Sequence, residues 1–377
     1  MNASYHEIRN REELQAILLK GGRISRCAFR SIDFTGFAEC CNLSQECRFS
    51  HCLFMGCTFA PGMEKQIEKN NLVFSSIDVP YNIFSGKLYT ADTLYEGYRE
   101  GCPESYAECF DSIVYQHYLQ TGKRADDIKE TLARTLHDHA MSDALHDLLS
   151  HYEEKQVVGI MGGHGLLRTE PMYRSVVLIS KRLAEAGYLM ISGGGPGAME
   201  ATHLGAWMAG RNMSDVDMAL KVLSEAPSFT HPLWLDTAFT VRRMFPQDEY
   251  ISVGVPTWLY GHEPATPLAT HIAKYFENAI REDGILTLAM GGIIYSPGSA
   301  GTMQEIFQDA VQNHYLSFGY SSPMVFLGTD YWENQMPVYK LLTHLVATGK
   351  YKNLQLSITD DEDEIVNIIE RFKVMRL

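Results

Sequence analysis

The sequence contains no apolar run of about 18 residues, the length that a membrane-spanning helix needs. It also contains no dense run of lysine or arginine, and its 46 acidic residues outnumber its 32 basic ones. A nucleic-acid-binding surface needs a basic stripe, so no nucleic-acid partner is expected. The first ten residues lack the basic and apolar pattern of a secretory signal. We therefore expect a cytoplasmic protein that binds neither a membrane nor nucleic acid.

Paired zinc-binding cysteine motifs are absent as well. No cysteine belongs to a C-x-x-C pair with a matching second pair, so no metal site is expected. All eight cysteines lie in the first third of the chain: Cys27, Cys40, Cys41, Cys47, Cys52, Cys57, Cys102 and Cys109. Low-complexity tracts are also missing, and 45% of the 377 residues are hydrophobic. This length and composition predict one large globular domain with a smaller one.

Between residues 22 and 60, apolar residues recur every five positions. Phenylalanines occupy one position of this lattice: Phe29, Phe34, Phe49, Phe54 and Phe59. A smaller apolar residue precedes each of them by two positions: Cys27, Ile32, Cys47, Cys52 and Cys57. Neither a helix, with period 3.6, nor a strand, with period 2, produces this spacing. It suits a square solenoid in which one small and one large side chain per side point inward.

This segment resembles the pentapeptide-repeat family over about 40 residues. On this interpretation the cysteines are small core residues, the alternatives being metal or redox chemistry. The following stretches YAECFDSIVYQHYL and DIKETLARTLHDHAMSDALHDLLSHY space apolar residues three and four apart, which predicts helices. The predicted organisation is a repeat segment at 1–61, a helical connecting region at 62–150, and a nucleotide-binding domain at 151–377.

From residue 157 the pattern changes to alternating strands and helices. VVGIMGG and YLMIS are short apolar runs typical of buried parallel strands, and PMYRSVVLISKRLAEAG between them predicts a helix. A later strand, GGIIY, and a final helix, DEDEIVNIIERFKVM, continue the pattern. Strand, helix and strand in succession form the β-α-β unit of an open parallel sheet. We therefore expect an α/β, Rossmann-like domain flanked by helices, with the N-terminal solenoid and helical segment attached.

The first candidate ligand loop follows YLMIS. Four glycines, Gly193, Gly194, Gly195 and Gly197, stand between that strand and the next helix. Glycines allow a backbone to approach a ligand closely, and a helix N-terminus offers unpaired N–H groups to a phosphate. Tight packing alone can also require glycine there. The predicted nucleotide-binding residues of this loop are the four glycines with Met199 and Glu200.

The second candidate loop follows GGIIY and reads SPGSAGTMQE. Its predicted nucleotide-binding residues are Gly298, Ser299, Ala300, Gly301 and Thr302, and Glu305 lies in the first turns of the helix. A carboxylate there could instead stabilise the helix dipole or form a capping box with Thr302. Both loops end parallel strands, so both should lie at the carboxyl edge of one sheet, where open α/β folds bind ligands.

GGGPGAMEA and PGSAGTMQE together resemble the paired motifs of the LONELY GUY family, also labelled "possible lysine decarboxylase". The larger bacterial nucleotide 5′-monophosphate nucleosidases are the branch that shares the first loop. The resemblance implies a dimeric phosphoribohydrolase that needs no cofactor and cleaves a nucleoside 5′-monophosphate into free base and ribose 5-phosphate. The family's second motif has glycine at the position of Ser299.

The family's catalytic glutamate corresponds to Glu305. The family also has a catalytic arginine upstream of this glutamate. Counting back from Glu305 without a gap reaches Glu282, and a shift of one residue reaches Arg281. Arg242 and Arg243 are the alternative candidates for this arginine. The aromatic stretch 245–270 is expected to be an insertion whose Trp258 or Tyr260 could stack on a base, although packing is the simpler role. A non-catalytic nucleotide sensor or carrier is the alternative function. No dehydrogenase fingerprint is present, since GGHGLL fits one poorly.

Overall fold

The computed structural model describes residues 5–37 and 48–372. The chain divides into two compact units, one formed by Met1–Leu88 and Leu119–His146 and the other by Tyr89–Tyr118 and Asp147–Leu377. Each unit is described separately below. Cys40, Cys41 and Cys47, which belong to the predicted repeat segment, lie outside the described residues. The predicted three-part division of the chain stays a prediction.

The first unit is built mainly from short parallel strands. Its four-stranded sheet has the order β1-β3-β5-β6, and β2 pairs with β4 in a second sheet. The elements are β1 (His6–Ile8), α1 (Arg11–Leu19), β2 (Ile24–Ser25), β3 (Cys27–Arg30), β4 (Phe49–Ser50), β5 (Leu53–Met55), α2 (Glu64–Ile67) and β6 (Leu72–Phe74). The long helix α5 (Ile128–Leu149), predicted from its apolar spacing, begins in this unit.

The phenylalanines of the five-residue lattice pack against one another in the core of this unit. Phe29 stacks on Phe54 with ring centroids 4.8 Å apart, and Phe34 and Phe49 meet them edge to face. Cys27 and Cys52 are buried in the same cluster, as expected for small core residues. The five-residue period therefore identifies side chains that share one core, while membership of the pentapeptide-repeat family stays a prediction.

The second unit carries the predicted strand and helix alternation. Its strands are β7 (Val157–Met161), β8 (Leu189–Ser192), β9 (Ser252–Gly254), β10 (His271–Ile272), β11 (Gly292–Tyr295), β12 (Pro323–Leu327) and β13 (Gln355–Thr359). Its helices are α3 (Ala91–Leu94), α4 (Phe110–Gln120), α6 (Pro171–Glu185), α7 (Ala198–Trp207), α8 (Met213–Ser224), α9 (Trp234–Met244), α10 (Asn278–Leu288), α11 (Ala300–Tyr315), α12 (Val338–Ala347) and α13 (Glu362–Arg371). Short helical turns occur at Pro103–Glu108, Glu154–Gln156, Trp258–Tyr260 and Tyr331–Gln335.

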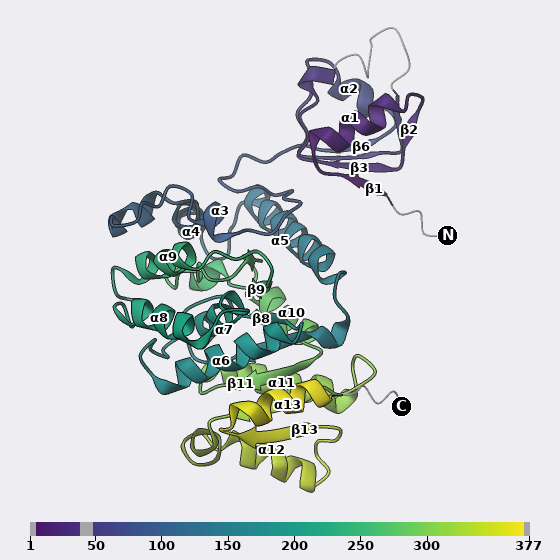
Figure 1. The fold of residues 1–377 in the computed structure, drawn as a ribbon. Coiled ribbons are helices and arrows are strands. Elements are labelled where there is room, and N and C mark those ends of the chain that lie inside the picture. Colours follow the sequence, from purple (N-terminus) through teal and green to yellow (C-terminus); the bar gives the residue numbers. More distant parts are fainter. Residues whose placement is uncertain (1–4, 38–47, 373–377) are drawn as a thin grey trace. The chain divides into compact units, whose positions relative to one another are not determined.

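The seven strands form one parallel sheet with the order β10-β9-β8-β7-β11-β12-β13. Strands β8, β9, β11 and β13 of this sheet are labelled in Figure 1. Helices cover both faces of it. Ile294 of β11 belongs to the core cluster that includes α6, α7 and α13, whereas the hydroxyl of the next residue, Tyr295, donates to Asp309 of α11. Successive strand residues point to opposite faces, so α11 lies on the other side of the sheet from α6. This is the Rossmann-like fold expected from the sequence.

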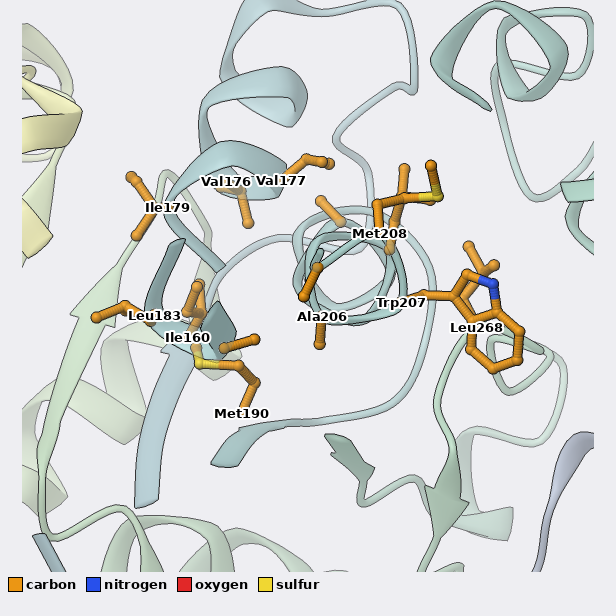
Figure 2. Close-up of a cluster of buried hydrophobic side chains, with 14 of the residues drawn as sticks. Ile160, Val176, Val177, Ile179, Leu183, Met190, Ala206, Trp207, Met208 and Leu268 are labelled. Carbon is orange, nitrogen blue, oxygen red and sulfur yellow. The ribbon is translucent and has the colours of Figure 1, made fainter. Parts of the chain in front are cut away.

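The core cluster on the α6 side anchors the strands next to the two glycine loops. Figure 2 shows side chains of α6 and α7 gathered with Ile160 of β7 and Met190 of β8. Both of these strand residues are fully buried. Burial of these side chains stabilises the position of both strands, and therefore also the position of the loop that follows each strand.

Candidate functional site

A cavity of about 370 Å³ opens at the carboxyl edge of the sheet. Three turns that follow parallel strands contribute to its wall: Gly162–His164 after β7, Gly193 and Met199 after β8, and Ser299–Thr302 after β11. The rest of the wall comes from α10, from the second turn of α11, and from the segment around Tyr260. This volume is in the range of small-molecule sites in proteins.

The cavity lies at the point where the chain reverses its direction of travel across the sheet. From β7 the chain proceeds to β8 and β9 on one side, and it returns to β11 and β12 on the other. Crossovers in opposite directions leave the turns after β7 and β11 without a helix packed between them. Open α/β folds bind their ligands at such a point, so the sheet order places the cavity where this fold binds ligands.

Close backbone contacts hold the three turns together. The amide of Gly163 donates to the carbonyl of Pro297 at 3.0 Å, and its carbonyl accepts from Ala198 N at 3.1 Å. Gly197 has φ +69°, and a Cβ added there would overlap the carbonyls of Gly163 and His164. The glycine at 197 is therefore required both by backbone conformation and by the approach of the β7 turn.

The residues of the first predicted loop take up different places. Gly193 and Met199 line the cavity, whereas Gly194 accepts a hydrogen bond from Thr266 N at 2.8 Å. A Cβ on Gly195 would lie 3.0 Å from Met199 Cε. Glu200 is fully buried, and Arg168 donates to both of its oxygens, at 2.5 and 2.8 Å. This carboxylate is thus held inside the protein rather than in the cavity wall.

The second predicted loop lies along the cavity from Ser299 to Thr302, at the N-terminus of α11. Ser299 is the N-cap residue of α11, with φ −110° and ψ −134°, at the position where the family has glycine. Its side chain makes no capping hydrogen bond, which leaves the hydroxyl available to a ligand. Gly298 packs against Thr302, whose side chain a Cβ at 298 would overlap. First-turn N–H groups of α11 lack helical partners and therefore suit an anion.

Glu305 lies in the cavity wall but is only 9% exposed. Burial raises the pKa of its carboxyl from 4.5 to about 7; Arg281 opposes this rise and Glu282 adds to it. Within residues 5–37 and 48–372, no group donates a hydrogen bond to this carboxylate. A buried acid that titrates near neutral pH and faces a cavity is typical of a functional site.

Arg281 is the arginine that the structure brings to the cavity. Its Nε donates to the carbonyl of Val255 at 3.0 Å, and a Cβ on Gly193 would overlap its Nη2. Arg242 instead donates to Pro267 O at 2.6 Å and covers Trp207, while Arg243 pairs with Glu100. The guanidinium of Arg281 is thus held through Nε, its Nη2 lies beside the first glycine loop, and its Nη1 is 3.8 Å from Glu282 Oε1.

Glu282, the alternative position from the ungapped count, has a different environment. Asn278 Nδ2 donates to its Oε1 and Gln304 Nε2 donates to its Oε2, both at 2.7 Å. Both oxygens of Glu282 are therefore already bonded within the protein. The carboxylate contributes negative charge to the cavity, and it opposes ionisation of Glu305.

The cavity wall also contains residues that the two loop motifs do not identify, among them His164, Tyr260 and Glu263. Tyr260 and Glu263 come from the predicted insertion, and Tyr260 is 45% exposed. Trp258, the other aromatic considered there, is fully buried and stacks on Phe276 with ring centroids 4.5 Å apart. Trp258 is therefore a packing residue, and the tyrosine is the aromatic that faces the cavity.

Among the described residues, no group of three or more His, Cys, Asp or Glu side chains is arranged to hold a metal ion. No helix in that part of the chain is long and apolar enough to cross a membrane.

No protein-family model and no curated protein matches the chain. Similar solved structures include the molybdenum cofactor binding protein from Rippkaea orientalis, 14% identical over 57% of this chain and 94% of that one, with a TM-score of 0.37. The Moco carrier protein of Chlamydomonas rheinhardtii is 16% identical over 57% and 95%, with a TM-score of 0.35. TM1055, a structural genomics target, is 19% identical over 57% and 99%, with a TM-score of 0.38. The fold assignment rests on the sheet order and helix placement described above.

Proposed function

We propose that this protein is a phosphoribohydrolase that cleaves the N-glycosidic bond of a nucleoside 5′-monophosphate. The observation that carries the proposal is the position of Glu305. Its carboxylate is buried, makes no hydrogen bond to a described residue, and shares one cavity with Arg281 and the turn Ser299–Thr302 at the N-terminus of α11. Phosphate held at the head of α11 would place the attached ribose beside the second turn of the same helix, where Glu305 lies.

In the proposed reaction, the bond between C1′ and the base nitrogen breaks and its electron pair leaves with the base. Positive charge then develops on the sugar, and an anionic Glu305 stabilises it or accepts a proton from the attacking water. Water supplies the hydroxyl of ribose 5-phosphate, and the base takes up a proton. Arg281 and the N–H groups of Ser299–Thr302 hold the phosphate and need no metal or redox cofactor for this task.

The proposal is tested by incubating the protein with purine and pyrimidine nucleoside 5′-monophosphates and quantifying free base by chromatography. We expect stoichiometric release of base and ribose 5-phosphate, and no release from the corresponding nucleosides. Binding without turnover of any monophosphate would instead identify a nucleotide sensor or carrier, the alternative weighed from the sequence.

Replacing Gly193 with alanine should weaken ribose 5-phosphate binding by about tenfold, the loss expected for one charge-assisted hydrogen bond. The added Cβ would overlap Arg281 Nη2 and lie 2.5 Å from Met199 Sδ. The guanidinium is the far end of a flexible side chain, so it would move rather than prevent folding. Titration calorimetry measures the change in Kd.

Gly284→Ala is the matched control, because Gly284 lies in α10 with no atom within 4 Å of an added Cβ. Its affinity for ribose 5-phosphate should equal that of the unmodified protein. Equal affinities for all three proteins would show that Arg281 does not contribute to phosphate binding.

A further inference from the structure

One wall of the cavity comes from the segment after β9, and Glu263 is its charged residue. Glu263 N donates to Tyr260 O at 2.9 Å within the segment, and Thr266 N ties the segment to the first glycine loop by donating to Gly194 O at 2.8 Å. A Cβ added to Gly195 would lie 3.9 Å from Glu263 Oε2. The carboxylate of Glu263 is therefore held beside the first glycine loop, in the same cavity as Glu305.

The carboxylate of Glu263 makes no hydrogen bond within the part of the chain that the structure describes, although its side chain is only 18% exposed. The nearest side-chain nitrogens are His164 Nδ1 at 3.7 Å and His262 Nε2 at 3.8 Å from its Oε1, both beyond hydrogen-bond length. Glu282, in the same cavity, has both oxygens bonded at 2.7 Å. Mostly buried carboxylates normally have donors, so a ligand that supplies them fits the unbonded Glu263.

The proposed function fixes which part of a ligand would reach this wall. With phosphate at Ser299–Thr302 and the anomeric carbon at Glu305, the remaining part of a nucleotide in this cavity is its base. Tyr260 lines the cavity next to this position and offers an aromatic ring to a planar heterocycle. Glu263 then faces an edge of the base.

An ionised carboxylate only accepts hydrogen bonds, and its two oxygens suit two parallel N–H donors. We propose that Glu263 determines base specificity by accepting a ring N–H and the adjacent exocyclic amino group, so that the substrate class is nucleotides with a guanine-type edge. This inference rests on the proposed function for the orientation of the ligand. Bases that present a single donor at that edge would leave one oxygen of Glu263 without a partner, which a site of this kind discriminates against strongly.

Guanosine and inosine 5′-monophosphates test this inference because they differ only by the 2-amino group. Their Kd values are measured by calorimetry in the Glu305→Gln background, where turnover does not interfere, and kcat/KM is measured with Glu305 intact. We expect the guanine nucleotide to be preferred at least tenfold in Kd, and Glu263→Gln to remove most of that preference while changing inosine nucleotide binding by less than threefold. Glu249→Gln changes an exposed glutamate that precedes β9 and does not line the cavity; it is the control and should keep the preference.

Equal affinity for the two nucleotides, or a preference that survives Glu263→Gln, would overturn the role of Glu263 even if base release occurs. Absence of detectable binding of either nucleotide would overturn it too. Conversely, a Glu263-dependent preference in Kd without any base release would support the specificity role and contradict the hydrolase function. The binding and turnover measurements therefore separate the two proposals.

Discussion

Replacing Glu305 with glutamine is expected to reduce base release by about 100- to 1000-fold while nucleotide binding is retained. Glutamine has nearly the same shape but carries no negative charge for the developing positive charge on the ribose. The loss should therefore appear in kcat, with a small change in Kd. Chromatographic assay of free base and calorimetry on the same preparation measure the two quantities. Turnover within a factor of three of that of the unmodified protein would contradict the role assigned to Glu305.

The rate of base release should also depend on pH through Glu305. Its pKa is raised to about 7 in the folded protein, mainly by burial, so half of the molecules carry the protonated acid near neutral pH. The proposed mechanism requires the ionised form, and kcat/KM should consequently rise as the pH increases through about 7. A rate that falls over this range would indicate that the protonated form is active instead.

Replacing Glu305 with glutamine should also stabilise the folded protein at alkaline pH. Because the folded pKa of about 7 exceeds the ordinary value of 4.5, the stability linked to this group is complete below about pH 4.5 and is lost as the pH rises through about 7. At pH 8 the buried charge lowers the free energy of unfolding by at most about 3 kcal/mol. Glutamine avoids that cost, so Tm should exceed that of the unmodified protein at pH 8 and approach it at pH 5.

Glu249→Gln, at an exposed position, is the control for this measurement and should leave Tm unchanged at both pH values. If Glu305→Gln and the unmodified protein have the same Tm at pH 8, the buried charge of Glu305 does not lower the free energy of unfolding. In that case a change of kcat/KM near neutral pH would have to come from the titration of a group other than Glu305.

Removing the carboxylate of Glu200 is expected to lower the free energy of unfolding by about 3–5 kcal/mol, the largest stability effect predicted for this chain. Glu200 and Arg168 have side chains that are 0% and 1% exposed, and the guanidinium bonds to both oxygens of the carboxylate. The hydroxyl of Tyr173 donates to Glu200 Oε2 at 2.9 Å. Glu200→Ala would leave a buried cation without its partner.

The carbonyls of Ala226 and Trp234 also accept from Arg168, at 3.0 and 3.2 Å, so the guanidinium cannot readily move to solvent. We expect thermal denaturation to show a Tm for Glu200→Ala that is roughly 10 °C below that of the unmodified protein. Asp217→Ala is the matched control because it breaks an exposed ion pair with Arg174 and should cost less than about 1 kcal/mol. Similar losses for both variants would mean that the buried pair contributes no more than the exposed one.

The sequence alone determined the features that depend on local chain geometry. Apolar spacing predicted α5 and α6, because a helix repeats its buried face at a fixed spacing, and short continuous apolar runs predicted the strands β7, β8 and β11, because strands inside a parallel sheet are buried on both faces. The five-residue lattice likewise identified Phe29 and Phe54 as core residues before any contact was known. Glycine and serine residues between strands and helices predicted Ser299–Thr302 as a ligand loop, since close backbone approach restricts the residue type.

The tertiary structure decided which residues share the site. Arg281 and Glu282 are neighbours in the chain, but adjacent helical residues point about 100° apart, so no count along the sequence could choose between them. Only the packing of α10 against the sheet turns Arg281 toward Gly193. Glu200 belongs to a predicted loop motif, yet its pairing with Arg168, 32 residues away, takes it out of the cavity wall.

Glu263 shows the same limit most clearly. No motif surrounds it, and its place in the cavity follows from the strand order, which puts the segment after β9 beside the glycine loop after β8. Sheet order depends on contacts between residues far apart in sequence, whereas a motif records only near neighbours. The sequence therefore determined the elements and the glycine-rich turns that we propose bind phosphate, and the tertiary structure determined which arginine lines the cavity, the environment of Glu305 and the place of Glu263 in the cavity wall.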